Sequence, residues 1–135
     1  MIIQKNIVLS AVGRGYHLIT KTILDQIGSL PDAGLLNLFL KHTSAALSIN
    51  ENADPSVRYD MEGISDRLVP ENVNYSHDLE GSDDMPAHFK SSMLGVSLNI
   101  PISKGHLDLG TWQGIYLCEF RNCGGNRHIT ATIYY

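Results

Sequence analysis

The stretch from Tyr75 to Lys90 carries the most varied set of reactive side chains in the sequence. It holds two histidines, three aspartates, a glutamate and a lysine. Neutral imidazole nitrogens and carboxylate oxygens are common ligands of divalent metal ions, so this stretch is a candidate metal site. The alternative is a solvent-exposed acidic loop, because loops are polar by default. His77 and His88 do not have helical spacing, so a shared site requires the chain between them to fold back.

Two further groups of polar residues follow the ends of expected strands. His42 comes directly after a short apolar run, where a histidine is more often hydrogen-bonded to the backbone than bound to a metal. Asp54, which precedes Pro55, has the pattern of a helix cap. Glu51 lies in the same group and has no such structural role, which makes it the functional candidate there.

Trp112 is the only tryptophan, and it lies in a glycine-bounded connection from Gly110 to Gly114. One interpretation is a tight turn with an aromatic plug. The other is the wall of a pocket, because glycines let a ligand approach backbone N–H groups closely. The sequence contains no serine–histidine–aspartate order and no phosphate-binding loop that would identify a reaction.

The strands and helices that must position these residues are visible as apolar patterns. Alternating or short, bounded apolar runs predict strands at residues 1–12, 16–19, 34–40, 45–50, 96–100, 106–109, 115–120 and 129–135. The first two strands are expected to form a hairpin, and Pro101 is expected to end the fifth strand. Apolar spacings of three and four predict a helix capped by Thr20 and a second helix from Pro55 to Pro70, with the apolar stripe Val57, Met61, Ile64 and Leu68. A shorter helix is expected over residues 87–94.

This order of elements predicts one α+β domain over residues 1–135, with antiparallel sheets and two main helices. A chain of 135 residues is long enough for one core. The strands present more apolar surface than two helices can cover. A second sheet or another subunit must therefore shield part of it.

Composition and charge exclude several classes of protein. With 43% hydrophobic and 18% charged residues, the chain is typical of a globular domain. A net charge of −4 without a cluster of lysine and arginine argues against a nucleic-acid partner. The longest apolar run, residues 35–40, is too short to cross a membrane, and residues 1–6 do not resemble an export signal. Cys118 and Cys123 are too few for a disulfide framework, so we expect a cytoplasmic protein.

Three segments carry a resemblance to a known family: His42 to Glu51, His77 to Lys90, and Leu109 to Glu119. They resemble, in this order, the hallmark segments of the YjbQ family, also called the secondary thiamine-phosphate synthase family. The resemblance implies a two-layer antiparallel β-sandwich that assembles as a homotrimer around the threefold axis. It also implies weak thiamine-phosphate synthesis, in which a pyrimidine diphosphate joins a thiazole phosphate with loss of pyrophosphate.

The resemblance also implies a set of pocket residues by matching position. The residues that it implies as metal ligands are His42, His77, Asp83 and His88. The residues that it implies as catalytic groups are Glu51, Asp84, Lys90, Glu119 and Arg127. The residues that it implies as contacts of a bound cofactor or substrate are Thr111, Trp112 and Gln113.

Three functions are compatible with these residues. The first is a transferase in which Mg²⁺, together with Lys90 and Arg127, offsets the charge of departing pyrophosphate, while Trp112 stacks on the pyrimidine. The second is a hydrolase of a phosphorylated or amide-containing metabolite, with zinc bound by histidines. The third is a trimer that binds a metabolite without turnover. The sequence leaves zinc and magnesium undecided.

Overall fold

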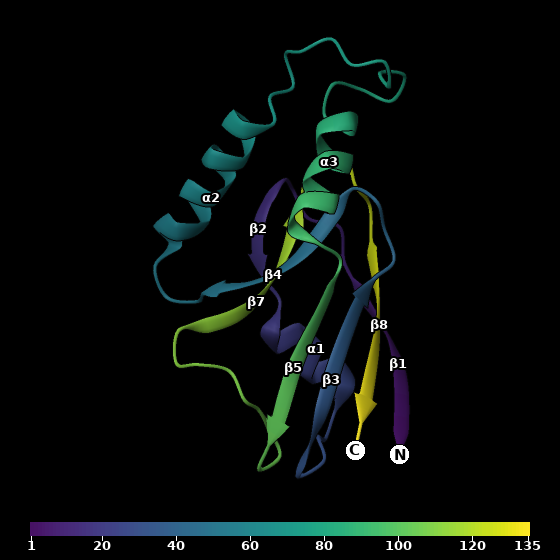
Figure 1. Ribbon diagram of the computed structural model, residues 1–135, viewed down its shortest axis with the longest axis vertical. Helices are drawn as coiled ribbons and strands as arrows, with labels where there is room; N and C mark the ends of the chain where they lie inside the picture. The colour runs from purple at the N-terminus through teal and green to yellow at the C-terminus, as the bar shows by residue number, and fades with distance from the viewer.

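The computed structural model describes residues 1–135 as eight strands and three helices (Figure 1). The strands are β1 Ile2–Leu9, β2 Gly15–Leu18, β3 Ala33–Leu40, β4 Ala45–Glu51, β5 Ser97–Ser103, β6 His106–Leu107, β7 Gln113–Glu119 and β8 Arg127–Tyr134. The helices are α1 Thr20–Ile27, α2 Pro55–Leu68 and α3 Asp84–Leu94. This is the α+β fold that the sequence predicts, with two main helices and the shorter third helix that was expected over residues 87–94. None of them is long and apolar enough to cross a membrane.

The strands form two antiparallel sheets. One has five strands in the order β1-β8-β3-β5-β6, and the other has three in the order β2-β7-β4. The predicted hairpin of the first two strands is wrong: β1 pairs with β8 and β2 pairs with β7, in different sheets. Period-two alternation identifies a strand, but it does not identify its partner, because a suitable apolar face can pair with several strands.

The main core contains buried side chains from both sheets and from α1. It includes Leu36 and Leu38 of β3, Ile115 and Leu117 of β7, and Ile23 of α1, all at most 1% exposed. The other face of the three-stranded sheet is buried as well, in a smaller cluster that includes Ala46, Cys118 and Ala87 of α3. Both faces of this sheet are therefore covered, and α3 packs directly on β4.

The start of α1 differs from the prediction. Thr20 is the first helical residue and not the cap, and its hydroxyl oxygen accepts a hydrogen bond from Ile115 N at 2.9 Å. A threonine at a helix start can bond to a neighbouring strand instead of its own helix, and spacing alone does not distinguish the two. Pro101 likewise does not end β5, which continues to Ser103.

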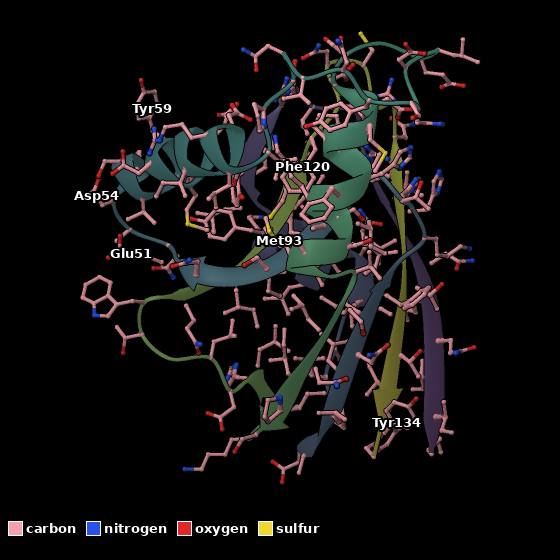
Figure 2. The ribbon with its side chains drawn as sticks, turned by 45° about the horizontal axis from the view of Figure 1, so that its top comes forward. Glu51, Asp54, Tyr59, Met93, Phe120 and Tyr134 are labelled. Atoms are coloured by element: carbon pink, nitrogen blue, oxygen red, sulfur yellow. The ribbon has the colours of Figure 1, made fainter.

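Helix α2 begins as the sequence predicts, and its later part contacts β2, where the hydroxyl oxygens of Tyr16 and Ser65 lie 2.7 Å apart. The side chain of Asp54 accepts a hydrogen bond from Ser56 N, and Pro55 is the first helical residue. The predicted apolar stripe is only partly covered, because Ile64 and Leu68 are 45% and 68% exposed. Figure 2 shows Glu51, Asp54 and Tyr59 together on the side of the molecule where α2 begins.

Helix α3 begins at Asp84, three residues before the predicted start. An aspartate in the first turn is stabilised by the partial positive charge of a helix N-terminus, and a proline is tolerated there. The end of the polar stretch is thus helical, whereas the part from Val69 to Asp83 is the loop that crosses from α2 to α3 (Figure 1).

Candidate metal centre

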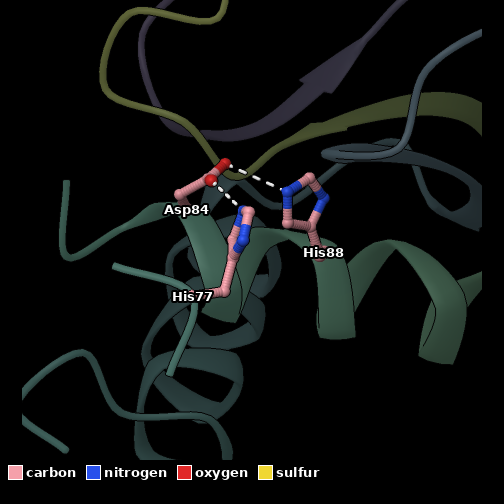
Figure 3. Close-up of side chains that lie close together, drawn as sticks. All are labelled: His77, Asp84 and His88. Atoms are coloured by element: carbon pink, nitrogen blue, oxygen red, sulfur yellow. Dashed lines mark hydrogen bonds and ion pairs between the residues drawn. The ribbon is translucent and has the colours of Figure 1, made fainter. Parts of the chain in front are cut away.

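His77, Asp84 and His88 come together at the start of α3. Asp84 and His88 are one helical turn apart and lie on the same face, and His77 reaches them from the preceding loop (Figure 3). His77 Nε2 lies 2.8 Å from Asp84 Oδ2, and His88 Nε2 lies 3.2 Å from Asp84 Oδ1. One ligand atom from each residue lies within 4.8 Å of the others.

The orientation of His88 makes this contact chemically informative. Its Nδ1 lies 2.9 Å from the carbonyl oxygen of Thr43, which can only accept, so Nδ1 carries a proton. In the neutral ring, Nε2 is then an acceptor, and it faces a carboxylate oxygen that is also an acceptor. A cation between the two atoms, either a proton or a metal ion, removes their repulsion. A backbone carbonyl that fixes the far nitrogen is also the usual support of a metal-binding histidine.

Arg121 holds the carboxylates at the start of α3 and was missed in the sequence. Its Nε lies 2.9 Å from Asp83 Oδ2, and one terminal nitrogen lies 2.7 Å from Asp84 Oδ1. The other terminal nitrogen donates to the carbonyl oxygen of Glu80 at 3.0 Å. The hydrogen bond to Asp83 raises the pKa of Arg121, and the charges of both aspartates add to this effect. The only signal in the sequence is an arginine just after a strand, which is too common to be informative.

Asp83 is committed to this structural network. Burial raises the pKa of its carboxyl, but hydrogen bonds from Asn122 N and from Arg121 outweigh burial, so the pKa lies below its ordinary value. Its Oδ2 accepts both of these bonds at 2.9 Å. The geometry therefore gives Asp83 a supporting position beside the cluster, whereas the resemblance implied a metal ligand.

His42 lies outside the three-residue cluster. Its Nε2 accepts a hydrogen bond from His128 N at 2.8 Å, and the two rings stack with centroids 5.8 Å apart. Burial, followed by the charge of Arg127, lowers the pKa of His42 and favours its neutral form. The sequence leaves two interpretations of His42, a metal ligand or a histidine hydrogen-bonded to the backbone, and its position matches the second.

Glu119 and Arg127 form a buried ion pair behind the site. Arg127 Nε and one terminal nitrogen lie 2.8 and 2.5 Å from the two carboxylate oxygens of Glu119, and Arg127 also bonds to Ser44. Both residues are at most 3% exposed. Gly124 fits against this pair, because an added Cβ would lie 2.5 Å from Glu119 Oε1. Glu119 and Arg127, both predicted as catalytic groups, are therefore hydrogen-bonded to each other.

Lys90 is also paired inside the protein. It is 1% exposed, and its Nζ lies 2.8 Å from Asp66 Oδ1 and 5.5 Å from the centre of the Phe120 ring. Asp66 in turn binds Arg14 at 3.0 Å. The amine thus links α3 to α2, and its charge is already offset by a carboxylate.

The remaining predicted residues lie at the far end of β4. Thr43, just before β4, contacts His88, whereas Glu51 is the last residue of the strand. The seven residues from Ala45 to Glu51 span roughly 20 Å. Thr111, Trp112 and Gln113 lie beside Glu51, because Glu51 pairs with Gln113 in the ladder. Within one chain, this group and the histidine cluster cannot contact the same small molecule.

The end of β4 has unsatisfied groups of its own. Glu51 Oε2 is buried without a hydrogen-bond partner, as is Arg58 Nε in α2. Trp112 is 64% exposed, although its carbonyl accepts a hydrogen bond from Asn52 N at 2.9 Å. Thr111 and Gln113 are exposed as well.

Comparisons with family models, curated proteins and solved structures all identify the same family. A family model described as "UPF0047 protein YjbQ-like" matches residues 5–135. The UPF0047 protein YjbQ of Escherichia coli O157:H7 is 57% identical over 132 residues, which cover 96% of each chain. The protein of the same name from Salmonella typhimurium is 56% identical with the same coverage. A crystal structure of a YjbQ/UPF0047 protein from Clostridium acetobutylicum superposes with a TM-score of 0.83 at 36% identity, covering 96% of this chain and 99% of that one.

Proposed function

The chain belongs to the UPF0047 family of YjbQ-like proteins, and we propose that it is a hydrolase that uses a zinc-type metal ion held by His77, Asp84 and His88. The observation that carries the proposal is the approach of two acceptors, His88 Nε2 and Asp84 Oδ1, to 3.2 Å. His88 Nε2 has no donor to accept from, so a metal ion there would give it a partner, whereas Asp84 Oδ1 also accepts a hydrogen bond from Arg121. The substrate class we propose is a small polar metabolite that carries a phosphate or an amide.

The donor set fits a transition-metal ion better than Mg²⁺. Two imidazoles and one carboxylate are typical ligands of zinc or iron, whereas Mg²⁺ prefers oxygen ligands. Ligands about 2.1 Å from a tetrahedral zinc ion are roughly 3.4 Å from each other. Here the two imidazoles approach different oxygens of Asp84, at 2.8 and 3.2 Å, and one ligand atom from each residue lies within 4.8 Å of the others. Three protein ligands leave a position for water or a substrate oxygen, and the ion would supply Lewis-acid activation there.

The protein's own residues fix this geometry. The Thr43 carbonyl holds the His88 ring with Nε2 toward Asp84, and Arg121 holds Asp84 through Oδ1. Asp84 itself is 2% exposed, so its carboxylate is screened little by water. The site is therefore preorganised on the helix side, with only His77 contributed by a loop.

Thiamine-phosphate synthesis is the second candidate, and the exposed indole of Trp112 favours it as a surface for a pyrimidine. Lys90 and Arg127 count against it, because each is paired with a carboxylate inside the protein. The test is release of pyrophosphate from a pyrimidine diphosphate and a thiazole phosphate. If Trp112→Ala released pyrophosphate at the wild-type rate, Trp112 would no longer support thiamine-phosphate synthesis.

Metal content tests the hydrolase proposal. We expect the protein, purified without chelator, to contain about one equivalent of zinc or iron per chain, and His88→Ala to lose it. The matched control is His106→Ala, an exposed histidine of β6 that should keep the metal. Full metal content in both His88→Ala and His77→Ala would refute the site.

The homotrimer and the two-layer sandwich also belong to this proposal. The core cluster that both sheets share supports the sandwich, and the outer face of the five-stranded sheet supports the homotrimer. The register places Ile2, Tyr134, Leu35 and Pro101 in one row across four strands. Phe39 lies on the same face of β3 as Leu35, and both are exposed, at 48% and 36%. The outward positions of β1, β3, β5 and β8 carry no lysine, arginine, aspartate or glutamate. An uncharged sheet face of this kind is typical of a surface buried between subunits.

We also propose a cytoplasmic location, supported by the state of the cysteines. Cys118 and Cys123 are both free. Burial raises the pKa of Cys118 to about 12, so its thiol stays protonated and unreactive at neutral pH.

A further inference from the structure

The loop that carries His77 to the cluster also forms a hollow of about 410 Å³, lined mostly by polar residues. His77 lines this hollow and contacts Asp84 in the cluster (Figure 3), so the hollow adjoins the proposed metal position. A molecule bound at the open position of the ion would therefore extend into it. Its other polar lining residues include Asn72, Asn74, Asp78 and Ser82.

The charges around this hollow are mainly negative. Arg121 is the one lysine or arginine that pairs with a carboxylate between His77 and the first residue of α3. A divalent ion and Arg121 together supply three positive charges, so the four carboxylates of this segment leave one negative charge even with the ion bound. The first two of the four are exposed and form no ion pair. The four carboxylates are those of Asp78, Glu80, Asp83 and Asp84.

The other positive groups near the hollow are already neutralised. Arg14 pairs with Asp66 and with Glu71, which lines the hollow, and Lys90 pairs with Asp66 at 2.8 Å. Two cations and two carboxylates therefore cancel. The N-terminus of a helix often binds anions, but the first turn of α3 already carries the carboxylate of Asp84. No positive charge is left over for an anionic ligand.

We infer that the substrate of the proposed hydrolase is an amide without an anionic group, bound with its polar end in the hollow beside Asp78. This inference rests on the proposed metal centre and selects between the two substrate classes given for it. A phosphate monoester carries about two negative charges at pH 7 and would lose its hydration beside carboxylates, which is costly. A neutral or ammonium-bearing amide avoids this cost, and an ammonium group is attracted by the free carboxylates.

The same charge balance favours release of the product. In hydrolysis of the amide the C–N bond breaks, the hydroxyl of water joins the carbonyl carbon, and the other proton of water joins the departing nitrogen. The new carboxylic acid ionises at neutral pH. Its negative charge is repelled by Asp78 and Glu80, whereas the neutral amide was not.

Binding of small probes to the zinc-loaded, ¹⁵N-labelled protein tests the substrate class. The probes are glycinamide, which is an amide with an ammonium group, and methyl phosphate, titrated at pH 7 and low ionic strength into the millimolar range expected for molecules this small. We expect glycinamide to give saturable amide shifts at His77, Asp78 and Ser82 and to bind about threefold or more tighter than methyl phosphate. Methyl phosphate binding as tightly as glycinamide, or no saturable shift with glycinamide, would overturn the inference.

A charge variant of the hollow makes the result specific. Asp78→Asn removes one negative charge, so it should weaken glycinamide by roughly two- to fivefold and strengthen methyl phosphate by a similar factor. A structural defect would weaken both probes. The matched control is Asp108→Asn, at an exposed position near β6, which should change neither affinity. If Asp78→Asn changed both affinities in the same direction, or changed neither, the electrostatic role of Asp78 would be refuted.

Zinc titration of the same protein separates this inference from the proposal on which it rests. A protein that binds no zinc at His77, Asp84 and His88 refutes the metal centre and the inference with it. Zinc binding combined with a preference for methyl phosphate refutes only the amide substrate.

Discussion

At the scale of single residues, the site is organised by what each carboxylate already binds. Asp84 faces two imidazoles and one guanidinium nitrogen, whereas Asp83 faces Arg121 and a backbone N–H. The sequence shows two adjacent aspartates and cannot tell them apart. The difference arises because successive residues at a helix start point in different directions. Arg121, which binds Asp83 and Asp84 through different nitrogens, is distant from both in the sequence, and no local pattern identifies it.

The hydrogen bonds of Asp83 should make its contribution to stability depend on pH. The folded pKa lies below the ordinary value, so the contribution is fully present above about pH 4 and is lost as the pH falls through the folded pKa. At pH 7 we expect Asp83→Asn to lower the free energy of unfolding by about 2 kcal/mol. Urea unfolding at pH 7, 5, 4 and 3.5 should show a constant difference from wild type at pH 7 and 5 that shrinks below pH 4.

The control for this prediction is Asp108→Asn, at an exposed position near β6. It should change stability by less than about 0.5 kcal/mol at every pH. A difference between wild type and Asp83→Asn that grows on acidification would contradict the assigned direction of the pKa shift.

At the scale of elements, most boundaries could be predicted from the sequence, but the pairing of strands could not. Asp54 and Pro55 mark the start of α2 because capping is a local interaction within a few residues. The partner of β1 is β8, at the other end of the chain, and no local pattern specifies that contact. The same limit applies to the site. The stretch from His77 to Lys90 indicates a metal site, but only tertiary structure separates His42 and Glu51 from it.

The loop between β7 and β8 gives a test of how tightly the buried pair is packed. An added Cβ at Gly124 would lie 2.5 Å from Glu119 Oε1 and 2.7 Å from a terminal nitrogen of Arg127. Both atoms belong to buried, hydrogen-bonded groups that cannot move away freely. We expect Gly124→Ala to lower the free energy of unfolding by about 1–3 kcal/mol, measured by urea denaturation.

Gly13→Ala is the matched control, because a Cβ there meets no atom within 4 Å and the backbone needs no positive φ. It should be within about 0.5 kcal/mol of wild type. Equal stability of the two variants would show that the Glu119–Arg127 pair is not rigidly held.

At the scale of the whole molecule, the exposed apolar residues of the five-stranded sheet form the face at which we propose that chains contact each other. The sequence predicts more apolar strand surface than two helices cover, and the structure leaves Phe39, Leu35 and Tyr134 exposed on an uncharged sheet face. If this face joins subunits, Phe39→Lys places a charge in the interface and should dissociate the assembly.

Light scattering coupled to size-exclusion chromatography measures this directly. We expect three times the mass of the chain for the wild type and a lower mass for Phe39→Lys. Tyr59→Lys, on the exposed surface of α2, is the control that should keep the wild-type mass. A monomeric wild type would refute the trimer and leave the uncharged face without an explanation.

The most direct test of the central claim is an anomalous difference map from crystals grown with zinc and recorded at the zinc absorption edge. We predict one peak per chain about 2.0–2.2 Å from His88 Nε2, with a nitrogen of His77 and an oxygen of Asp84 at similar distances. A map with no peak at this position, or with its peak at His42 and His128 instead, would contradict it.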